Sequence, residues 1–212
     1  MKQFSNYQYS SMKRLLLFST LLCTLFSCSS GSENHEWVDL GLPSGTKWAT
    51  YNIGASNPED YGDYFAWGET SAKSSYTETN YKKLNRQIDD LAGKRKYDAA
   101  RANWGGKWHT PTKEQFEELF YNCTLTFTST ENGSNGCIVT GPNGKSIFLP
   151  AAGKKDGEEV TNADSYGFYW CSTSHEGAYA GLSAYCPTFY DDGFIFFWNE
   201  YSCGHTVRPV LD

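Results

Sequence analysis

The sequence predicts an α+β domain in which two helices lie between two series of short, mainly antiparallel strands. Helical patterns occur between residues 97 and 120, and strand patterns occur on both sides of them. The 20 glycines and 15 tyrosines are typical of short strands joined by tight turns. Aromatic residues make up 17% of the chain, which excludes a disordered protein. The length of 212 residues fits one domain with an appendage.

The N-terminus has the features of a secretory signal. Residues 15–26 form a run of 12 mostly apolar residues, and Lys13 and Arg14 precede it. As a helix this run spans about 18 Å, which is too short for a hydrocarbon core of about 30 Å. We therefore expect residues 1–27 to be a cleaved signal peptide. A start at Met12 would leave the mature protein unchanged.

The end of this run, Leu25-Phe26-Ser27-Cys28, resembles the lipobox of bacterial lipoproteins. The resemblance implies cleavage before Cys28 and a diacylglycerol on its sulfur. We expect residues 28–35 to be the lipidated cysteine and a flexible tether, because serine and glycine follow Cys28. The protein is then an exported outer-membrane lipoprotein, facing the periplasm or the cell surface.

The charge of the chain limits its partners. The net charge is −6, which argues against a nucleic-acid partner. Loss of residues 1–27 removes three basic residues and no acid, so 15 basic residues face 24 acidic ones, a net charge of −9. We expect such an acidic domain to contact the membrane through its lipid anchor only.

Five cysteines remain after Cys28, which are Cys123, Cys137, Cys171, Cys186 and Cys203. An odd number outside the cytoplasm leaves at least one free thiol, and the sequence does not choose among the pairings. No Cys-x-x-Cys occurs and no histidine stands at zinc spacing, so we expect no structural zinc.

The first strands alternate between apolar and polar residues. We expect strands at Trp37–Leu40 and Lys47–Thr50. The aromatic and glycine-rich segment Tyr61–Gly68 should be extended and buried on one face. Residues 69–93 are polar and show no period, which predicts a long loop.

Two helices follow this loop. The first covers Tyr97–Asn103 and ends at Gly105-Gly106. The second covers Thr110–Phe120, with Thr112 as N-cap and Gln115 completing a capping box.

Strands and turns make up the rest of the chain. Turn signals are Asn132-Gly133, Asn143-Gly144 and Asp191-Asp192-Gly193. The expected strands are Thr124–Thr128, Ile138–Val139, Ser146–Leu149, Phe168–Ser172, Ala178–Tyr185, Phe194–Trp198 and Thr206–Val210.

Nine segments in order, covering about residues 36–212, are similar to the Fibrobacter succinogenes major paralogous domain family. They are Val38–Leu42, Lys47–Thr50, Tyr61–Thr70, Ala102–Trp108, Pro111–Lys113, Thr140–Gly144, Phe148–Gly153, Gly167–Trp170 and Val207–Val210. The resemblance implies one C-type-lectin-like domain over residues 36–212, related to the formylglycine-generating-enzyme fold. It also implies an exported or lipid-anchored protein of Bacteroidetes-like bacteria. A fold does not imply an activity.

A formylglycine-generating-type oxidase is one alternative function. That enzyme needs a close pair of copper-binding cysteines near the C-terminus. Here Cys203 comes 17 positions after Cys186, and Val207–Val210 stands where the enzyme's Gly-Phe-Arg-Cys end would be. We therefore expect no enzyme and assign no catalytic residue.

Calcium-dependent sugar binding is a second alternative. Trp198-Asn199-Glu200 resembles the Trp-Asn-Asp motif of such lectins, and Asp191-Asp192 is nearby in the sequence. The Glu-Pro-Asn or Gln-Pro-Asp loop that completes the lectin site is absent. We expect no cofactor, with calcium as the alternative.

Recognition or adhesion at the cell surface, with a glycan or protein ligand, is the function we expect. Aromatic and small polar residues together suit adaptable binding surfaces, and they are dense between residues 176 and 201. An envelope structural role without a small ligand is the other alternative. The expected ligand-binding residues are Tyr179, Tyr185, Tyr190, Asp191, Asp192, Trp198, Asn199, Glu200 and Tyr201.

The remaining large side chains should serve the core. We expect the five tryptophans that recur in the family-like segments to be buried in the core. Arg208 lies in an apolar strand, and we expect it to pair with Asp63 or Glu69. The tryptophans are Trp48, Trp67, Trp104, Trp108 and Trp170.

Overall fold

The computed structural model describes residues 35–82, 87–130, 133–177 and 180–212. The predicted signal peptide, Cys28 and Tyr179 lie outside the described residues. Residues 32–212 form one compact unit.

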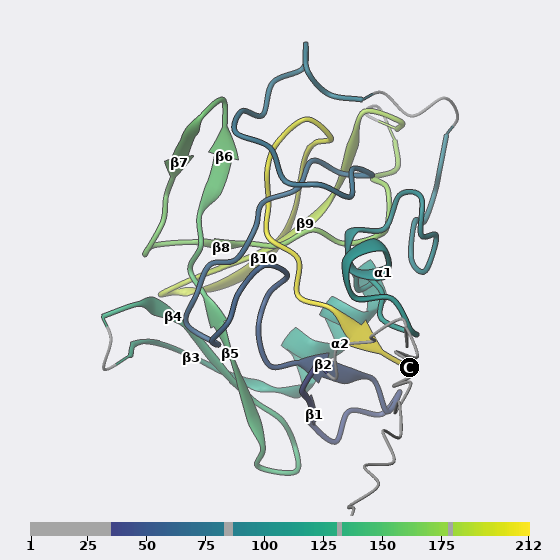
Figure 1. The fold of residues 1–212 in the computed structure, drawn as a ribbon. Coiled ribbons are helices and arrows are strands. Elements are labelled where there is room, and N and C mark those ends of the chain that lie inside the picture. The colour runs from purple at the N-terminus through teal and green to yellow at the C-terminus, as the bar shows by residue number, and fades with distance from the viewer. Residues whose placement is uncertain (1–34, 83–86, 131–132, 178–179) are drawn as a thin grey trace, which may run out of the picture. The chain divides into compact units, whose positions relative to one another are not determined.

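Short antiparallel strands and two helices build the described part of this unit, which confirms the α+β class (Figure 1). The helices are α1 (Ala99–Trp104) and α2 (Lys113–Asn122). One sheet has the order β1 (Trp37–Asp39), β2 (Lys47–Ala49), β11 (Val210–Leu211), and a second has the order β10 (Gly193–Glu200), β9 (Ser183–Tyr190), β8 (Gly167–Phe168). The others are β3 (Thr124–Ser129), β4 (Asn135–Thr140), β5 (Ser146–Pro150), and the ribbon β6 (Lys154–Asp156), β7 (Glu159–Thr161).

The helix ends follow from their capping residues. Asp98 accepts hydrogen bonds from the backbone N–H groups of Ala100 and Arg101, so α1 begins after Asp98 rather than at residue 97. The predicted capping box of Thr112 and Gln115 is confirmed. It starts α2 at Lys113, three residues later than predicted, and the helix continues to Asn122.

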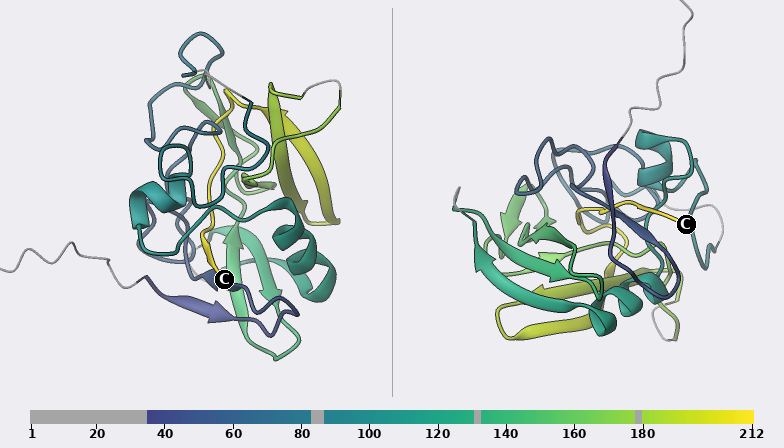
Figure 2. Two further views of the ribbon diagram at one scale, coloured as in Figure 1. Left: turned by 90° about the vertical axis from the view of Figure 1, so that its right-hand side faces the viewer. Right: turned by 90° about the horizontal axis from the view of Figure 1, so that it is seen from below.

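The first sheet brings the two ends of the described chain together. Trp48 in β2 is opposite Val38 on one side and Val210 on the other. β2 therefore lies between β1 and the C-terminal β11, and Figure 2 shows the C-terminus near this sheet. Trp48 is fully buried beneath this sheet.

Three hydrophobic clusters form the core, and every residue in them lies between Val38 and Leu211. A chain that begins at residue 29 therefore keeps the whole described core, and we expect it to fold without the preceding residues. The prediction that five tryptophans are core residues is confirmed, because Trp48, Trp67, Trp104, Trp108 and Trp170 are all buried.

The segment 61–68 differs from the prediction of burial on one face. Tyr64 through Trp67 are all buried. Instead of lying on a sheet, the segment hydrogen-bonds to another irregular stretch, from Phe65 N to His205 O and from Trp67 N to Tyr201 O. Both sides of the segment are therefore covered.

The later strands have different limits from those predicted. The turn at Asp191-Asp192 is confirmed, because Tyr190 is opposite Gly193 in the β9–β10 hairpin. The predicted strand at 168–172 is reduced to β8, and the one at 206–210 is reduced to β11. Of their other residues, Tyr169 and Thr206 form a single bridge with each other and no continuous ladder.

The predicted pairing of Arg208 with Asp63 or Glu69 is wrong. The side chain of Arg208 is fully buried and donates to Asn52 Oδ1 and to three backbone carbonyls. A guanidinium has five N–H donors in a fixed plane, so it can donate to several carbonyl oxygens at once. These acceptors take the place of the single carboxylate that the prediction assumed. Burial lowers the pKa of Arg208 to about 10.

Candidate functional site

The β9–β10 hairpin forms the platform of the candidate site. Each strand has eight residues, and β10 is the edge strand of its sheet. Ile195 is opposite Thr188, and Thr188 is opposite Phe168 on β8. Opposite residues in antiparallel strands point to the same face. These three side chains therefore form a row across the sheet.

Five side chains on this face make up what we call the apolar sheet face. The ring of Tyr166 lies 5.8 Å from that of Phe168 and 5.6 Å from that of Tyr190. Ile195 is 50% exposed, Phe197 is 47% exposed and Tyr166 is 38% exposed. The members are Tyr166, Phe168, Tyr190, Ile195 and Phe197.

The opposite face of the hairpin supplies the core contact. Phe194 and Phe196 lie 4.9 and 5.8 Å from the ring of Phe120 on α2, and Phe189 is fully buried. A hairpin with one buried face usually shows polar residues on the other. The second face is partly covered by another core cluster, which includes Ala184 and Cys186, whereas Ile195 and Phe197 on the edge strand remain about half exposed.

Polar groups border the apolar sheet face. The ammonium group of Lys154 lies 5.8 Å from the centre of the Phe168 ring. Asn199 follows Phe197 on the same face, and its side chain is buried beside the Cys186 thiol. A cation and an amide donor thus adjoin the exposed rings.

Cys186 and His205 lie beneath this face. The Cys186 sulfur is 3.8 Å from His205 Nδ1, and both side chains are fully buried. Burial raises the pKa of Cys186 to about 12 and lowers that of His205 well below its usual value. The pair is therefore a neutral thiol and a neutral imidazole, without the thiolate that nucleophilic chemistry needs.

The sequence-predicted ligand residues are divided between the two faces of the hairpin. Tyr190 and Asn199 are on the side of the apolar sheet face, whereas Tyr185, Trp198 and Glu200 point to the other side. There the rings of Tyr185 and Trp198 lie 5.2 and 5.4 Å from His175.

Tyr201 is a core residue. Its ring stacks on Trp67 at 4.3 Å, and its side chain is buried. The prediction placed Tyr201 in the binding surface because the sequence does not show that β10 ends at Glu200, one residue before it.

The residues suggested for calcium do not meet. Asp191 and Asp192 are exposed at the hairpin turn, and Asn199 and Glu200 are at the far end of β10. Seven residues of strand place the two pairs about 23 Å apart, so no single ion can be bound by both. No group of three metal-ligating side chains occurs in the parts of the chain that the structure describes.

No two of the cysteines that the structure describes are joined by a disulfide. All five cysteines of the described ranges are free thiols. Burial raises the pKa of both Cys186 and Cys203.

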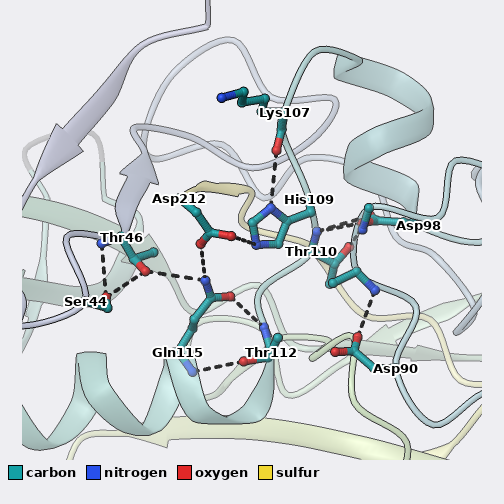
Figure 3. A network of polar contacts seen from close by, with 12 residues as sticks. Ser44, Thr46, Asp90, Asp98, Lys107, His109, Thr110, Thr112, Gln115 and Asp212 are labelled. Carbon is teal, nitrogen blue, oxygen red and sulfur yellow. Dashed lines mark hydrogen bonds and ion pairs between the residues drawn. The ribbon is translucent and has the colours of Figure 1, made fainter.

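A second polar cluster surrounds the start of α2 (Figure 3). His109 Nε2 lies 3.7 Å from an Asp212 carboxylate oxygen, and Gln115 donates to the other oxygen at 2.7 Å. Gln115 also accepts from the backbone N–H of Thr112. Nearby, Thr110 donates to the fully buried Asp98 at 2.7 Å. These contacts join the C-terminal segment to both helices, which is a structural role.

Sequence reasoning missed four members of the apolar sheet face, which are Tyr166, Phe168, Ile195 and Phe197. The available signal was the run Phe194–Trp198, in which every residue is apolar. Core clusters lie against both faces of the hairpin, and on β10 only Ile195 and Phe197 are large apolar side chains that remain about half exposed.

No protein-family model, no curated protein and no solved structure matches this chain. Among the described residues, no helix is both long and apolar enough to cross a membrane.

Proposed function

We propose that the protein is a non-enzymatic recognition or adhesion protein, which binds a glycan or protein ligand through the apolar sheet face. The proposal includes export and attachment to the outer membrane through a lipid on Cys28. It also includes the C-type-lectin-like fold and membership of the Fibrobacter succinogenes major paralogous domain family, on the resemblance of the segments between residues 36 and 212.

One observation carries the proposal. Ile195 and Phe197 are half exposed on an edge strand, and the exposed ring of Tyr166 lies beside Phe168 and Tyr190 of the same apolar sheet face. Exposed apolar patches of this kind cost solubility and mark interaction sites in soluble domains. Their burial by a ligand is favourable by roughly 25 cal/mol for each Å² removed from water.

The chemistry of the border suits an amphipathic ligand. Aromatic rings stack on the apolar faces of sugars or of protein side chains, and tyrosine hydroxyls, Lys154 and Asn199 can bond polar groups of the same ligand. The neutral Cys186–His205 pair beneath the surface supplies no nucleophile, which supports binding over catalysis.

The test is a binding screen of residues 29–212 against printed glycans and extracellular proteins, once with calcium and once with a chelator. We expect binding that the chelator leaves unchanged. Binding that requires calcium would contradict metal-free recognition and favour the calcium-dependent alternative. Absence of binding on every spot would contradict recognition and favour the envelope structural role.

A further inference from the structure

Positive charge is concentrated in one short segment of this acidic domain. Of the 15 basic residues between 28 and 212, five lie between 94 and 107. The one acid in that segment, Asp98, is fully buried and caps α1. The segment therefore exposes cations without carboxylates. We call the five residues the basic face, and they are Lys94, Arg95, Lys96, Arg101 and Lys107.

The basic face is open to solvent, and its Lys94 ammonium donates to the backbone carbonyl of Asp90. Lys94, Arg95 and Lys96 are exposed and line, with Tyr97, an open hollow of about 500 Å³. Lys96 lies 5.1 Å from the centre of the Tyr97 ring. No carboxylate forms an ion pair with a residue of the basic face within the described ranges, whereas Lys113 is paired with Glu117 at 2.7 Å.

The chain enters the domain beside this face. The ring of His35, the first described residue, stacks on Trp104 at 3.7 Å, and Trp104 is the last residue of α1. The side of the unit that carries α1 therefore holds the start of the domain (Figure 2).

The predicted lipid anchor must then lie close to the same side. Six residues separate Cys28 from His35, and a fully extended chain over this interval reaches at most about 25 Å. A membrane that holds the lipid on Cys28 is thus within reach of α1 and of the basic face.

An exposed tryptophan adds to this side of the domain. Trp37 follows His35 by two residues and is 46% exposed, with the ammonium group of Lys47 4.5 Å from its ring centre. Tryptophan and lysine are residues that favour the headgroup region of a bilayer. Glu36 and Asp212 adjoin this side and reduce its charge, which still leaves more cations than carboxylates.

We propose that the basic face docks on anionic headgroups of the membrane in which Cys28 is anchored, and so fixes the orientation of the domain. The inference rests on the proposed anchor but not on the apolar sheet face. It departs from the expectation that the lipid alone contacts the membrane, because that expectation used only the net charge. Docking through the α1 side turns the β9–β10 hairpin away from the bilayer, since Figure 2 shows α1 and the hairpin on different sides of the unit.

The test places residues 29–212, with an N-terminal hexahistidine tag, on vesicles that contain a nickel-chelating lipid. One vesicle is phosphatidylcholine, and the other also contains phosphatidylglycerol. Acetylation of lysines is then measured by mass spectrometry. Each docked basic residue favours the bound orientation by roughly fivefold. We expect acetylation of Lys94 and Lys96 to fall at least about fivefold on the anionic vesicles and to recover at high salt.

Lys145 supplies the matched control. It is exposed in the β4–β5 turn, outside the basic face, and forms no ion pair within the described ranges. Its acetylation should be equal on both vesicles. Lys96→Glu should remove the protection of Lys94, whereas Lys145→Glu, with the same change in net charge, should keep it.

Two results would overturn the inference. One is equal acetylation of Lys94 and Lys96 on both vesicles. The other is protection by soluble heparin with none on the anionic vesicles, which would assign the basic face to an acidic polysaccharide. Neither result bears on the ligand screen, so failure of this inference and failure of the proposed function remain distinguishable.

Discussion

Replacement of Arg208 by alanine tests how the domain is held closed. The Arg208 guanidinium connects three parts of the chain: it donates to Asn52 Oδ1 at 2.8 Å, to the carbonyls of Ala49 and Thr50 at 3.1 and 3.0 Å, and to the carbonyl of Phe148 at 2.9 Å. Alanine removes every donor and leaves four acceptors without this partner, two of them in buried and two in partly buried hydrogen bonds.

The expected loss follows from these contacts. A buried acceptor left unpaired costs about 1 kcal/mol or more, so four cost about 4 kcal/mol before any cavity is counted. For a domain of this size, 1 kcal/mol corresponds to a shift of about 2–4 °C in Tm. We therefore expect Arg208→Ala to lower the Tm by about 8–16 °C. Arg208→Lys keeps the charge but reaches fewer acceptors and should lose roughly half as much.

The assay is thermal unfolding of residues 29–212 followed by circular dichroism. Arg101→Ala is the control, because Arg101 is a partly exposed arginine without an ion pair in the described parts of the chain. Its Tm should change by less than about 2 °C. An Arg208→Ala protein that melts within that range of the wild type would refute the reasoning.

Two further predictions concern buried titratable groups. Because burial holds the pKa of His205 well below its usual value, the unfolded chain binds a proton that the folded chain refuses as the pH falls below about 6.5. The free energy of unfolding should therefore decrease there by up to about 1.4 kcal/mol per pH unit, and His205→Phe should flatten this slope in urea titrations; an unchanged slope would show that other groups cause it. Burial raises the pKa of Cys123 to about 11 and of Cys137 to about 12, so a thiol reagent at pH 8 should label the native protein far more slowly than the unfolded protein. Rapid labelling of Cys186 or Cys203 in the native state would instead revive the oxidase alternative.

Local signals predicted the helices better than the strands. The capping box at Thr112 and Gln115 is written within four residues, and the structure has it as predicted. The strand at 206–210 is shorter than its pattern, because the ladder with β2 includes only Val210 and Leu211. A strand exists only where a partner lies beside it, and the partner is set by distant parts of the chain.

Prediction of the candidate site would have required the register of the β9–β10 hairpin, which decides which side chains share a face. The sequence showed an aromatic stretch, but it did not show that Ile195 aligns with Thr188 and Phe168 on one face. Nor did it show that Asn199 and Glu200 point to opposite sides, far from Asp191. The partners of Arg208 were missed for a similar reason, since its acceptors are backbone carbonyls, which any sequence could supply.

The most direct test of the account compares ligand binding by the wild type, by Ile195→Ser/Phe197→Ser, and by the control Tyr121→Ser/Leu182→Ser. The control removes two side chains that are 71% and 64% exposed, outside the apolar sheet face. Loss of about 1 kcal/mol for each half-exposed apolar side chain corresponds to roughly 30-fold in affinity for the pair. Measured on the ligand found in the screen, we expect a loss of that order for Ile195→Ser/Phe197→Ser and less than about threefold for the control. Equal affinities of all three proteins would contradict the assignment of the apolar sheet face as the ligand surface.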